Sequence, residues 1–171
     1  MLVVLLRIII FIKITTDIES YKIFSTAGHY KDQNHVYWAF EIIPGADPST
    51  YDYVKTFWGY ADDTHVFYKG LMVKDADPES MERINYDFTK DKRHVYRRWK
   101  IIEGVDPTHF GQLKDYKYYY TDGEKIYYCE DNEYNEFFEV KGADINTFRY
   151  DSRSKRYKDR HGTYYAGQKI S

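Results

Sequence analysis

Four carboxylates crowd one short stretch of the chain, CEDNEYNEFF, which runs from Cys129 to Phe138. Close carboxylates can contact a basic protein, stay solvated in an ordinary loop, or hydrolyse a glycosidic bond. Sequence proximity does not give the separation between carboxyl groups on which glycoside chemistry depends. We therefore expect a contact surface for a protein partner, formed by Glu130, Asp131, Glu133 and Glu136.

Three histidines recur at one position of a repeated motif, His35, His65 and His94. If equivalent strands stacked directly, their imidazoles would form a ladder of metal ligands. The aspartate three residues before each histidine offers the oxygen ligands that Ca²⁺ prefers, although no copy has the spacing of a known calcium loop. The structural alternative is that these aspartates cap turns and that the histidines flank them. We expect neither a metal nor another cofactor.

Aromatic and basic side chains form two further candidate surfaces. Rings can stack on a sugar or a peptide, although packing in the core is their ordinary use; the candidates are Tyr116, Tyr118, Tyr119, Tyr120, Trp38, Trp58 and Trp99. A basic run near the C-terminus can hold a phosphate or an acidic partner, or form a solvated turn; its members are Arg153, Lys155, Arg156, Lys158 and Arg160.

Signatures of catalysis are absent from the sequence. It has no G-x-S-x-G elbow, no glycine-rich phosphate loop and no H-E-x-x-H helix. The single cysteine, Cys129, is followed by Glu130 and Asp131, whose charges disfavour a thiolate. We expect that the protein is not an enzyme.

An internal repeat organises most of the chain. Segments beginning near Tyr30, Tyr60, Phe88, Tyr119 and Tyr157 align with one another. Their leading aspartates are spaced by 30, 29, 31 and 37 residues, and are Asp32, Asp62, Asp91, Asp122 and Asp159. A second series, spaced by 30, 29 and 38 residues, consists of Asp47, Asp77, Asp106 and Asp144. The stretch from Cys129 to Phe138 explains the longer last spacing. Regular self-similarity of this kind is typical of repeat proteins.

Each copy predicts a turn, a β-hairpin and a short helix. Val66-Phe67-Tyr68 and Leu71-Met72-Val73 flank Lys69-Gly70, and two residues ending in glycine between apolar runs indicate a hairpin. The equivalent Ala39-Phe40 and Arg98-Trp99 lack the glycine. Asp-Pro in the second series suggests a helix N-cap followed by the first helical residue, and the apolar residues three apart, such as Tyr51 and Val54, suit one or two helical turns.

Length and charge limit the class of protein. The chain has 171 residues, 25 Lys+Arg and 27 Asp+Glu, so its formal net charge of −2 argues against a general nucleic-acid binder. Aromatic residues make up 19%, which argues against disorder. The apolar run in residues 1–14 is shorter than a membrane span and is interrupted by Arg7 and Lys13. It is either a degenerate signal or anchor, or a strand that caps the domain, and membrane attachment stays open.

The strings KDQNHVYW, ADDTHVFY and KDKRHVYR, each followed by a hairpin and then by sequences such as GADPSTY, resemble the DKNYY family. The resemblance covers residues from about Tyr30 to Ile170. It implies a bacterial protein defined by this repeat, without an established activity and without catalytic residues to transfer. Members often carry export signals, which implies the cell envelope or secretion; a cytoplasmic location is the alternative.

We therefore expect an N-terminal apolar segment, residues 1–29, and a repeat domain, residues 30–171. The predicted fold is mainly β with short helices, in which four to five hairpin-plus-helical-turn repeats of about 30 residues stack into an open, elongated sheet or solenoid. The expected function is non-catalytic protein binding, for example by an immunity or inhibitor protein. The alternative is a cell-envelope module that binds glycan through exposed Tyr and Trp.

Overall fold

The computed structural model describes residues 22–23, 28–114, 116–130 and 136–171. The predictions for the apolar run in residues 1–14, and those for Asp131 and Glu133, lie outside this part of the chain. Contacts divide the molecule into two compact units, one formed by residues up to Lys92 with Tyr96–Ile101, the other by Arg93–Val95 with Ile102–Ser171. No helix in the described ranges is long and apolar enough to span a membrane.

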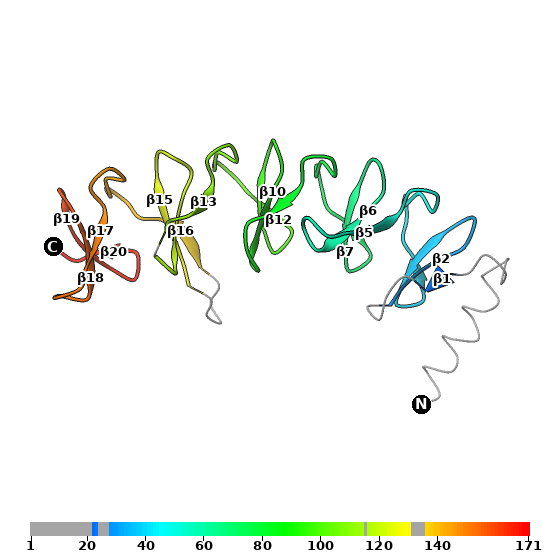
Figure 1. Ribbon diagram of the computed structural model, residues 1–171, viewed down its shortest axis with the longest axis horizontal. Coiled ribbons are helices and arrows are strands. Elements are labelled where there is room, and N and C mark those ends of the chain that lie inside the picture. Colours follow the sequence, from blue (N-terminus) through cyan, green and yellow to red (C-terminus); the bar gives the residue numbers. More distant parts are fainter. Residues whose placement is uncertain (1–21, 24–27, 115, 131–135) are drawn as a thin grey trace, which may run out of the picture. The chain divides into compact units, whose positions relative to one another are not determined.

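The predicted β-rich repeat is confirmed, and each repeat forms its own sheet. In the described residues, five antiparallel sheets have four strands each, and within every sheet the strands pair in chain order, so each sheet is an open meander (Figure 1). The strands form five separate sheets rather than one continuous sheet.

The first unit holds the first sheet, β1 (Lys22–Ile23), β2 (His29–Lys31), β3 (Val36–Trp38) and β4 (Glu41–Ile42), and the second sheet, β5 (Asp52–Val54), β6 (Gly59–Ala61), β7 (Val66–Tyr68) and β8 (Leu71–Met72). The third sheet is β9 (Glu82–Arg83), β10 (Phe88–Lys90), β11 (Val95–Arg97) and β12 (Lys100–Ile102). The second unit holds the fourth sheet, β13 (Gly111–Gln112), β14 (Tyr119–Thr121), β15 (Ile126–Cys129) and β16 (Phe137–Glu139), and the fifth, β17 (Arg149–Asp151), β18 (Arg156–Asp159), β19 (Gly162–Tyr165) and β20 (Gln168–Lys169).

The predicted hairpin joins the third and fourth strands of a repeat. Phe67 pairs with Met72 and Tyr68 with Leu71, in the register that the alternating pattern gives. Lys69 and Gly70 have φ of 50° and 73°, so both residues of the turn are left-handed, as a tight hairpin requires. The same pair of angles occurs without glycine at Ala39-Phe40 and Arg98-Trp99. Packing of the strands therefore imposes this turn even where the local sequence opposes it.

The predicted short helices are wrong. After Asp47, the N–H groups of Thr50 and Tyr51 bond to its carbonyl at 3.3 and 2.9 Å, which closes a single turn. The chain then extends into β5, the first strand of the next sheet. Equivalent segments form β9, β13 and β17, and no helix occurs in the described residues. Two apolar residues three apart do not distinguish a helix from one turn followed by a strand.

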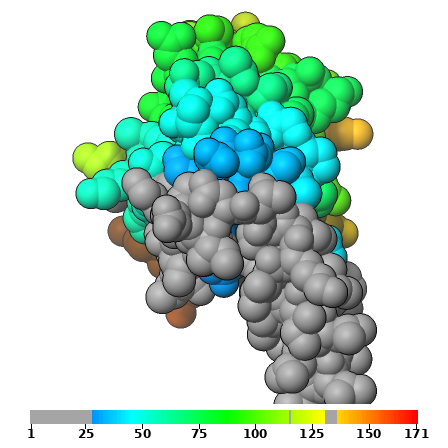
Figure 2. Space-filling view, turned by 90° about the vertical axis from the view of Figure 1, so that its right-hand side faces the viewer, coloured from blue at the N-terminus to red at the C-terminus, as the bar shows by residue number. Residues whose placement is uncertain are grey.

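The core follows the third strand of each repeat. Val66 and Phe67 point to opposite faces of β7 and are both fully buried, whereas Leu71 and Met72 on β8 are exposed. Both faces of the third strand are therefore covered, whereas the fourth strand is exposed to solvent. The first sheet, blue in Figure 2, contributes His29, whose ring stacks on Tyr60 of the second sheet with the ring centroids 3.6 Å apart. Neighbouring repeats in a unit thus build a shared core.

Candidate functional site

The leading aspartate of each repeat caps the turn between the second and third strands. In the first repeat, Asp32 Oδ1 accepts hydrogen bonds from the N–H groups of Asn34 and His35, at 2.8 and 2.7 Å. Its Oδ2 accepts a bond from the Tyr37 hydroxyl at 2.7 Å. Tyr96, Tyr127 and Tyr164 donate to their own leading aspartates in the same way. These carboxylates are structural acceptors, buried in the first four repeats and half-buried in the fifth.

The same carboxylates also bond to the neighbouring repeat. Asp62 Oδ2 accepts the N–H of Asp47 at 3.0 Å, and Asp159 Oδ2 accepts that of Asp144 at 2.6 Å. Asp77 N–H donates to Asp91 Oδ2 at 2.9 Å. The two aspartate series of the sequence therefore meet across repeat boundaries within each unit. We call this contact the aspartate latch.

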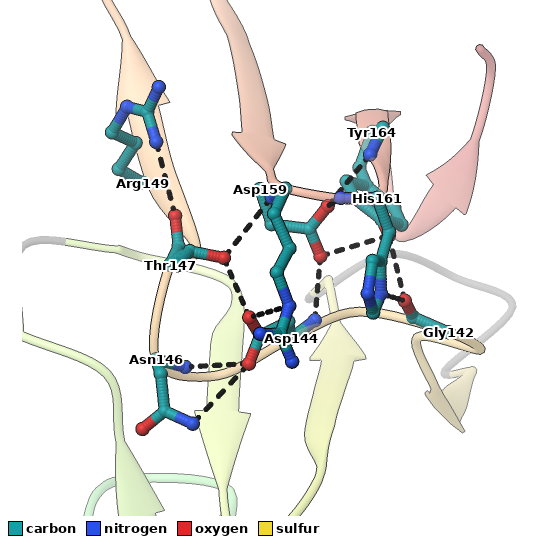
Figure 3. A network of polar contacts seen from close by, with 10 residues as sticks. Gly142, Asp144, Asn146, Thr147, Arg149, Asp159, His161 and Tyr164 are labelled. Carbon is teal, nitrogen blue, oxygen red and sulfur yellow. Dashed lines mark hydrogen bonds and ion pairs between the residues drawn. The ribbon is translucent and has the colours of Figure 1, made fainter.

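A hydroxyl completes the latch. Figure 3 shows the last copy, in which Thr147 Oγ1 donates to Asp144 Oδ2 at 2.8 Å and accepts the Arg160 N–H at 3.1 Å. Thr50 and Ser80 accept the N–H of Asp63 and Lys92 in the other two copies. Each of these hydroxyls lies three residues after an aspartate of the second series.

The junction after Asp106 differs because His109 occupies the hydroxyl position. Asp106 Oδ1 accepts the Thr108 N–H at 2.8 Å, and the His109 ring lies 3.7 Å from the other carboxylate oxygen. The N–H of Gly123, which follows the leading Asp122, donates to Thr121 Oγ1 instead. Among the described residues, this junction of the second unit has neither the hydroxyl bond nor the bond between the two aspartates.

Burial and hydrogen bonding oppose each other at the leading aspartates. Burial alone raises the pKa of Asp159, but the N–H groups of Asp144 and His161 and the Tyr164 hydroxyl bond to its charged form. The net result is a pKa below the ordinary value, and the same balance lowers the pKa of Asp32, Asp62 and Asp122. These groups stay ionised in the folded protein near neutral pH.

The histidines and aspartates proposed as metal ligands take part in these turns. His65 Nδ1 lies 2.8 Å from Thr64 Oγ1 and 3.4 Å from Asp62 Oδ1, within its own turn. His35 lies 4.0 Å from Asp32. Among the described residues, no group of three or more His, Cys, Asp or Glu side chains is arranged to hold a metal ion.

The basic run is divided among strand β18 and the turns on either side of it. Lys158 Nζ contacts Asp151 at 2.5 Å and Arg160 Nε contacts Asp144 at 2.7 Å, so two of its cations have acidic partners within the fifth repeat and its latch. The Arg156 guanidinium lies over the ring of Tyr165, 4.1 Å from its centroid. The structure therefore uses much of this charge internally.

The acidic stretch interrupts the fourth repeat. In the fifth sheet β19 and β20 are joined by the tight turn Ala166-Gly167, whereas β15 and β16 are separated by Glu130–Glu136. Glu130 Oε2 accepts the Tyr128 hydroxyl at 2.9 Å, and Glu136 is exposed. Of the four predicted contact residues, Glu130 and Glu136 are the two ends of the insertion, and Asp131 and Glu133 belong to the part that is not described.

A cavity of about 350 Å³ lies between the second and third sheets of the first unit. We call it the Trp58 pocket. Its walls come from the turns that join the first and second strands of the two repeats, from the strands beside them, and from the Arg98-Trp99 turn; they are Tyr53, Phe57, Trp58, Tyr68, Arg83, Asn85, Tyr86, Asp87, Thr89, Arg98 and Trp99.

Rings of both repeats surround the pocket. Trp99 of the third repeat stacks on Tyr68 of the second, with centroids 5.2 Å apart, and meets Phe57 edge-on. Gly59 permits this approach, because a Cβ there would lie 2.9 Å from the Trp99 ring. Trp58 is 61% exposed and Tyr86 is 88% exposed. Large rings held in contact with water are typical of binding surfaces.

Trp58 has an unusual backbone. Its φ is 56°, in the left-handed region that bulky residues avoid. Lys155 occupies the equivalent turn of the fifth repeat with φ of 53°, so the turn geometry belongs to the repeat and the tryptophan belongs to this copy. A ring placed at such a position without being buried suggests a use other than packing.

Sequence reasoning named Trp58 and Trp99 but missed most of this site. Tyr119 and Tyr120 are buried, and Tyr116, Tyr118 and Trp38 are half-buried, so the predicted aromatic surface is largely core. Tyr86 and Arg83 were not predicted. One signal in the sequence could have indicated the site. The equivalent segments KTFWGY and INYDFT, residues 55–60 and 84–89, differ in sequence although the motifs on either side of them repeat.

Tandem meanders of this kind, which share cores and carboxylates with their neighbours, define a β-repeat protein. The family model described as the DKNYY family matches residues 12–131, and the chain belongs to that family. No curated protein and no solved structure matches the chain.

Proposed function

We propose that this chain is a non-catalytic binding module of the bacterial cell envelope, and that its ligand is a glycan held in the Trp58 pocket. The observation that carries the proposal is the exposure of Trp58 and Tyr86 beside a cavity that also contains charged and amide side chains. The C–H faces of a sugar ring pack on the negative faces of aromatic rings, while its hydroxyls bond to polar groups at the edge.

The polar lining suits such a ligand. Arg98 Nε bonds to Asp87 Oδ1 at 2.9 Å, and this ion pair lies beside the aromatic walls. A sugar hydroxyl can donate to a carboxylate and accept from a guanidinium, so the pair offers partners of both kinds. A purely apolar ligand would displace water from Arg98 and Asp87 and offer no hydrogen bonds in its place, which would weaken its binding.

A protein partner is the second candidate, and the insertion supports it. The segment Glu130–Glu136 replaces a tight turn in an otherwise regular repeat, and repeat architecture alone does not require it. The partner would be a basic protein that contacts Glu130, Asp131, Glu133 and Glu136, as in an immunity or inhibitor protein.

We also propose that the repeats stack in chain order as an open, solenoid-like array. The support is local: within each unit the latches and shared rings join one repeat to the next. Stacked repeats of this type are suited to extended ligands, because each repeat adds surface beside its neighbour.

The decisive test compares binding of the full-length protein to purified envelope polysaccharide and to envelope proteins. Trp58→Asn is the informative variant, because asparagine tolerates the left-handed φ and the fold should persist. We expect it to weaken polysaccharide binding by about 30-fold, the usual effect of losing a central tryptophan. Tyr165→Asn, which removes another exposed ring outside the pocket, should bind like the wild type.

A second variant separates the two candidates. It changes Glu130, Asp131, Glu133 and Glu136 to serine and should leave polysaccharide binding intact. If the wild type retains no polysaccharide but captures an envelope protein that this variant loses, the glycan proposal is wrong and the insertion is the site. Equal retention of polysaccharide by wild type and Trp58→Asn would also overturn the pocket assignment.

A further inference from the structure

The Trp58 pocket contains one guanidinium that is held rigidly and left with unused donors. The Arg83 Cζ atom lies 3.7 Å from the centroid of Trp58 and 5.2 Å from that of Tyr86. Its Nε donates to the Asn85 carbonyl at 2.7 Å. In the described part of the chain, Arg83 makes no ion pair and its Nη groups donate no hydrogen bond. Two aromatic rings and one hydrogen bond to the backbone therefore hold the Arg83 guanidinium in place, while its Nη donors have no acceptor among the described residues.

The charges of the pocket leave Arg83 uncompensated. Asp87 is the acidic side chain among the lining residues, and it pairs with Arg98 at 2.9 Å. The site therefore favours an anionic group, and the planar fork of arginine matches a carboxylate with two parallel hydrogen bonds. Stacking on aromatic rings reduces the conformational entropy that the arginine would otherwise lose on binding.

A second polar group in the same cavity lacks a partner. Thr89, on β10, is only 7% exposed, and its Oγ1 atom has no hydrogen-bond partner among the described residues. It also lines the Trp58 pocket. A buried hydroxyl without a partner is destabilising, because it has lost its bonds to water and gained none in return. A ligand hydroxyl or carboxylate that reaches Thr89 Oγ1 would restore such a bond.

We infer that the ligand of this pocket is an acidic sugar, whose carboxylate bonds to the Nη groups of Arg83 while its ring packs on the exposed parts of the Trp58 and Tyr86 rings. This inference rests on the proposed glycan function and specifies its ligand class. The carboxylate belongs either to a uronic acid or to the lactyl group of a muramic acid, which present the same chemistry to the guanidinium.

The test measures dissociation constants of the full chain for tetragalacturonate, its methyl ester, N-acetylmuramic acid and N-acetylglucosamine. Wild type should bind one acidic sugar about 10- to 100-fold more tightly than its neutral counterpart, the range of a charge-assisted bidentate pair. Arg83→Met should reduce this ratio to near one. Arg83→Lys keeps the charge but loses the fork, so it should retain a small part of the preference.

Arg156→Met is the matched control. Arg156 also stacks on an exposed tyrosine, Tyr165, but lies outside the pocket, so this variant should keep the wild-type ratio. Thermal unfolding midpoints identify any variant that does not fold. If Arg83→Met fails to fold, the salt dependence of wild-type binding tests the inference. The preference of the wild type for the acidic sugar must then fall as the NaCl concentration rises, because salt screens the interaction between the carboxylate and the guanidinium.

The outcomes separate the two levels of the proposal. If wild type binds acidic and neutral sugars equally and Trp58→Asn loses both, the glycan site stands and the carboxylate inference is wrong. If no sugar binds, both are wrong. An added arm compares a peptide with a free C-terminal carboxylate and its amide; if Arg83 selects the free peptide and no sugar, the ligand is a peptide and the acidic-sugar inference is overturned.

Discussion

Asp159 accepts hydrogen bonds from two neighbours of its own turn, His161 and Gly162, and from the backbone of Asp144 in the preceding repeat. One side chain thereby closes a turn and fixes a repeat boundary. The sequence predicts the first role, because aspartate is a common turn-capping residue. The role at the repeat boundary was not predicted. The nearly equal spacings of the two aspartate series would have indicated it, because they keep each pair of aspartates at a constant separation.

His29 is the residue whose titration should be visible in folding. It is buried against Tyr60, and its Nδ1 lies 2.8 Å from the Tyr51 hydroxyl. Burial lowers the pKa of His29 from 6.5 to about 4. The unfolded chain therefore binds a proton at higher pH than the folded one, so stability falls as pH falls from 6.5 to about 4, by about 3 kcal/mol.

His29→Phe should keep the stacking on Tyr60 and remove this dependence. The measurement is the free energy of unfolding in urea for wild type and variant between pH 4 and 7. We expect the difference between the two proteins to change by about 3 kcal/mol across this interval. Parallel curves would contradict the assignment.

At the scale of elements, the chain folds as turn, strand and hairpin in every repeat. The sequence predicted the hairpin at Val66–Val73 because two apolar runs flank the Lys69-Gly70 turn, and the two strands pair as such a turn requires. It did not predict β5, β9, β13 and β17, because these two- and three-residue strands have no pattern of their own. These strands form because they pair with the strand that follows, and not because their own residues favour a strand.

The hydroxyl of the latch can be tested in both directions. Thr147→Val removes the acceptor for the Arg160 N–H and the donor to Asp144, and should lower the free energy of unfolding by about 1–2 kcal/mol. His109→Thr supplies the hydroxyl at the junction that lacks it, and should stabilise the protein by up to about 1 kcal/mol.

Thr56→Val is the control for these variants, because Thr56 is exposed and lies in a turn outside the latches. Its unfolding should match that of wild type. A loss of stability in His109→Thr equal to that in Thr147→Val would show that the position tolerates only its own residue and that the latch is not a general device.

At the scale of the whole molecule, the binding site was the least accessible to sequence reasoning. Trp58 and Arg83 are 25 positions apart and meet because two meanders pack side by side. Spacing within one repeat cannot reveal such a meeting, and the composition of 20 Tyr and 10 Phe hides a few exposed rings among many buried ones. The family match likewise identifies the repeat and not the pocket.

Four of the leading aspartates, two of which belong to latches, should make the whole protein sensitive to acid. The pKa of Asp32, Asp62, Asp122 and Asp159 is lower in the folded protein than the ordinary 3.8, so their stabilisation is present above about pH 4 and is lost as pH falls through the lowered values. Circular dichroism during acid titration should show a steep transition below pH 4. In this range His29 is protonated in both the folded and the unfolded chain, so it adds no further pH dependence.

Asp62→Asn should flatten this transition, because an amide does not titrate, while lowering stability at pH 7 through the loss of a charged acceptor. Asp63→Asn, at the exposed neighbouring position, serves as its control and should leave the titration unchanged. An unaltered transition in Asp62→Asn would exclude the latch as the source of acid sensitivity.

Every latch has complementary halves, a carboxylate on one repeat and an N–H with a hydroxyl on the repeat before it. The separation along the chain is nearly constant, 15, 14 and 15 residues from donor to acceptor aspartate. Excision of residues 62–90 would therefore bring Asp91 to the position of Asp62, fifteen residues after Asp47, and join two halves that already match. Gene duplication or deletion in steps of one repeat can thus alter the length of such a protein without creating an unmatched joint.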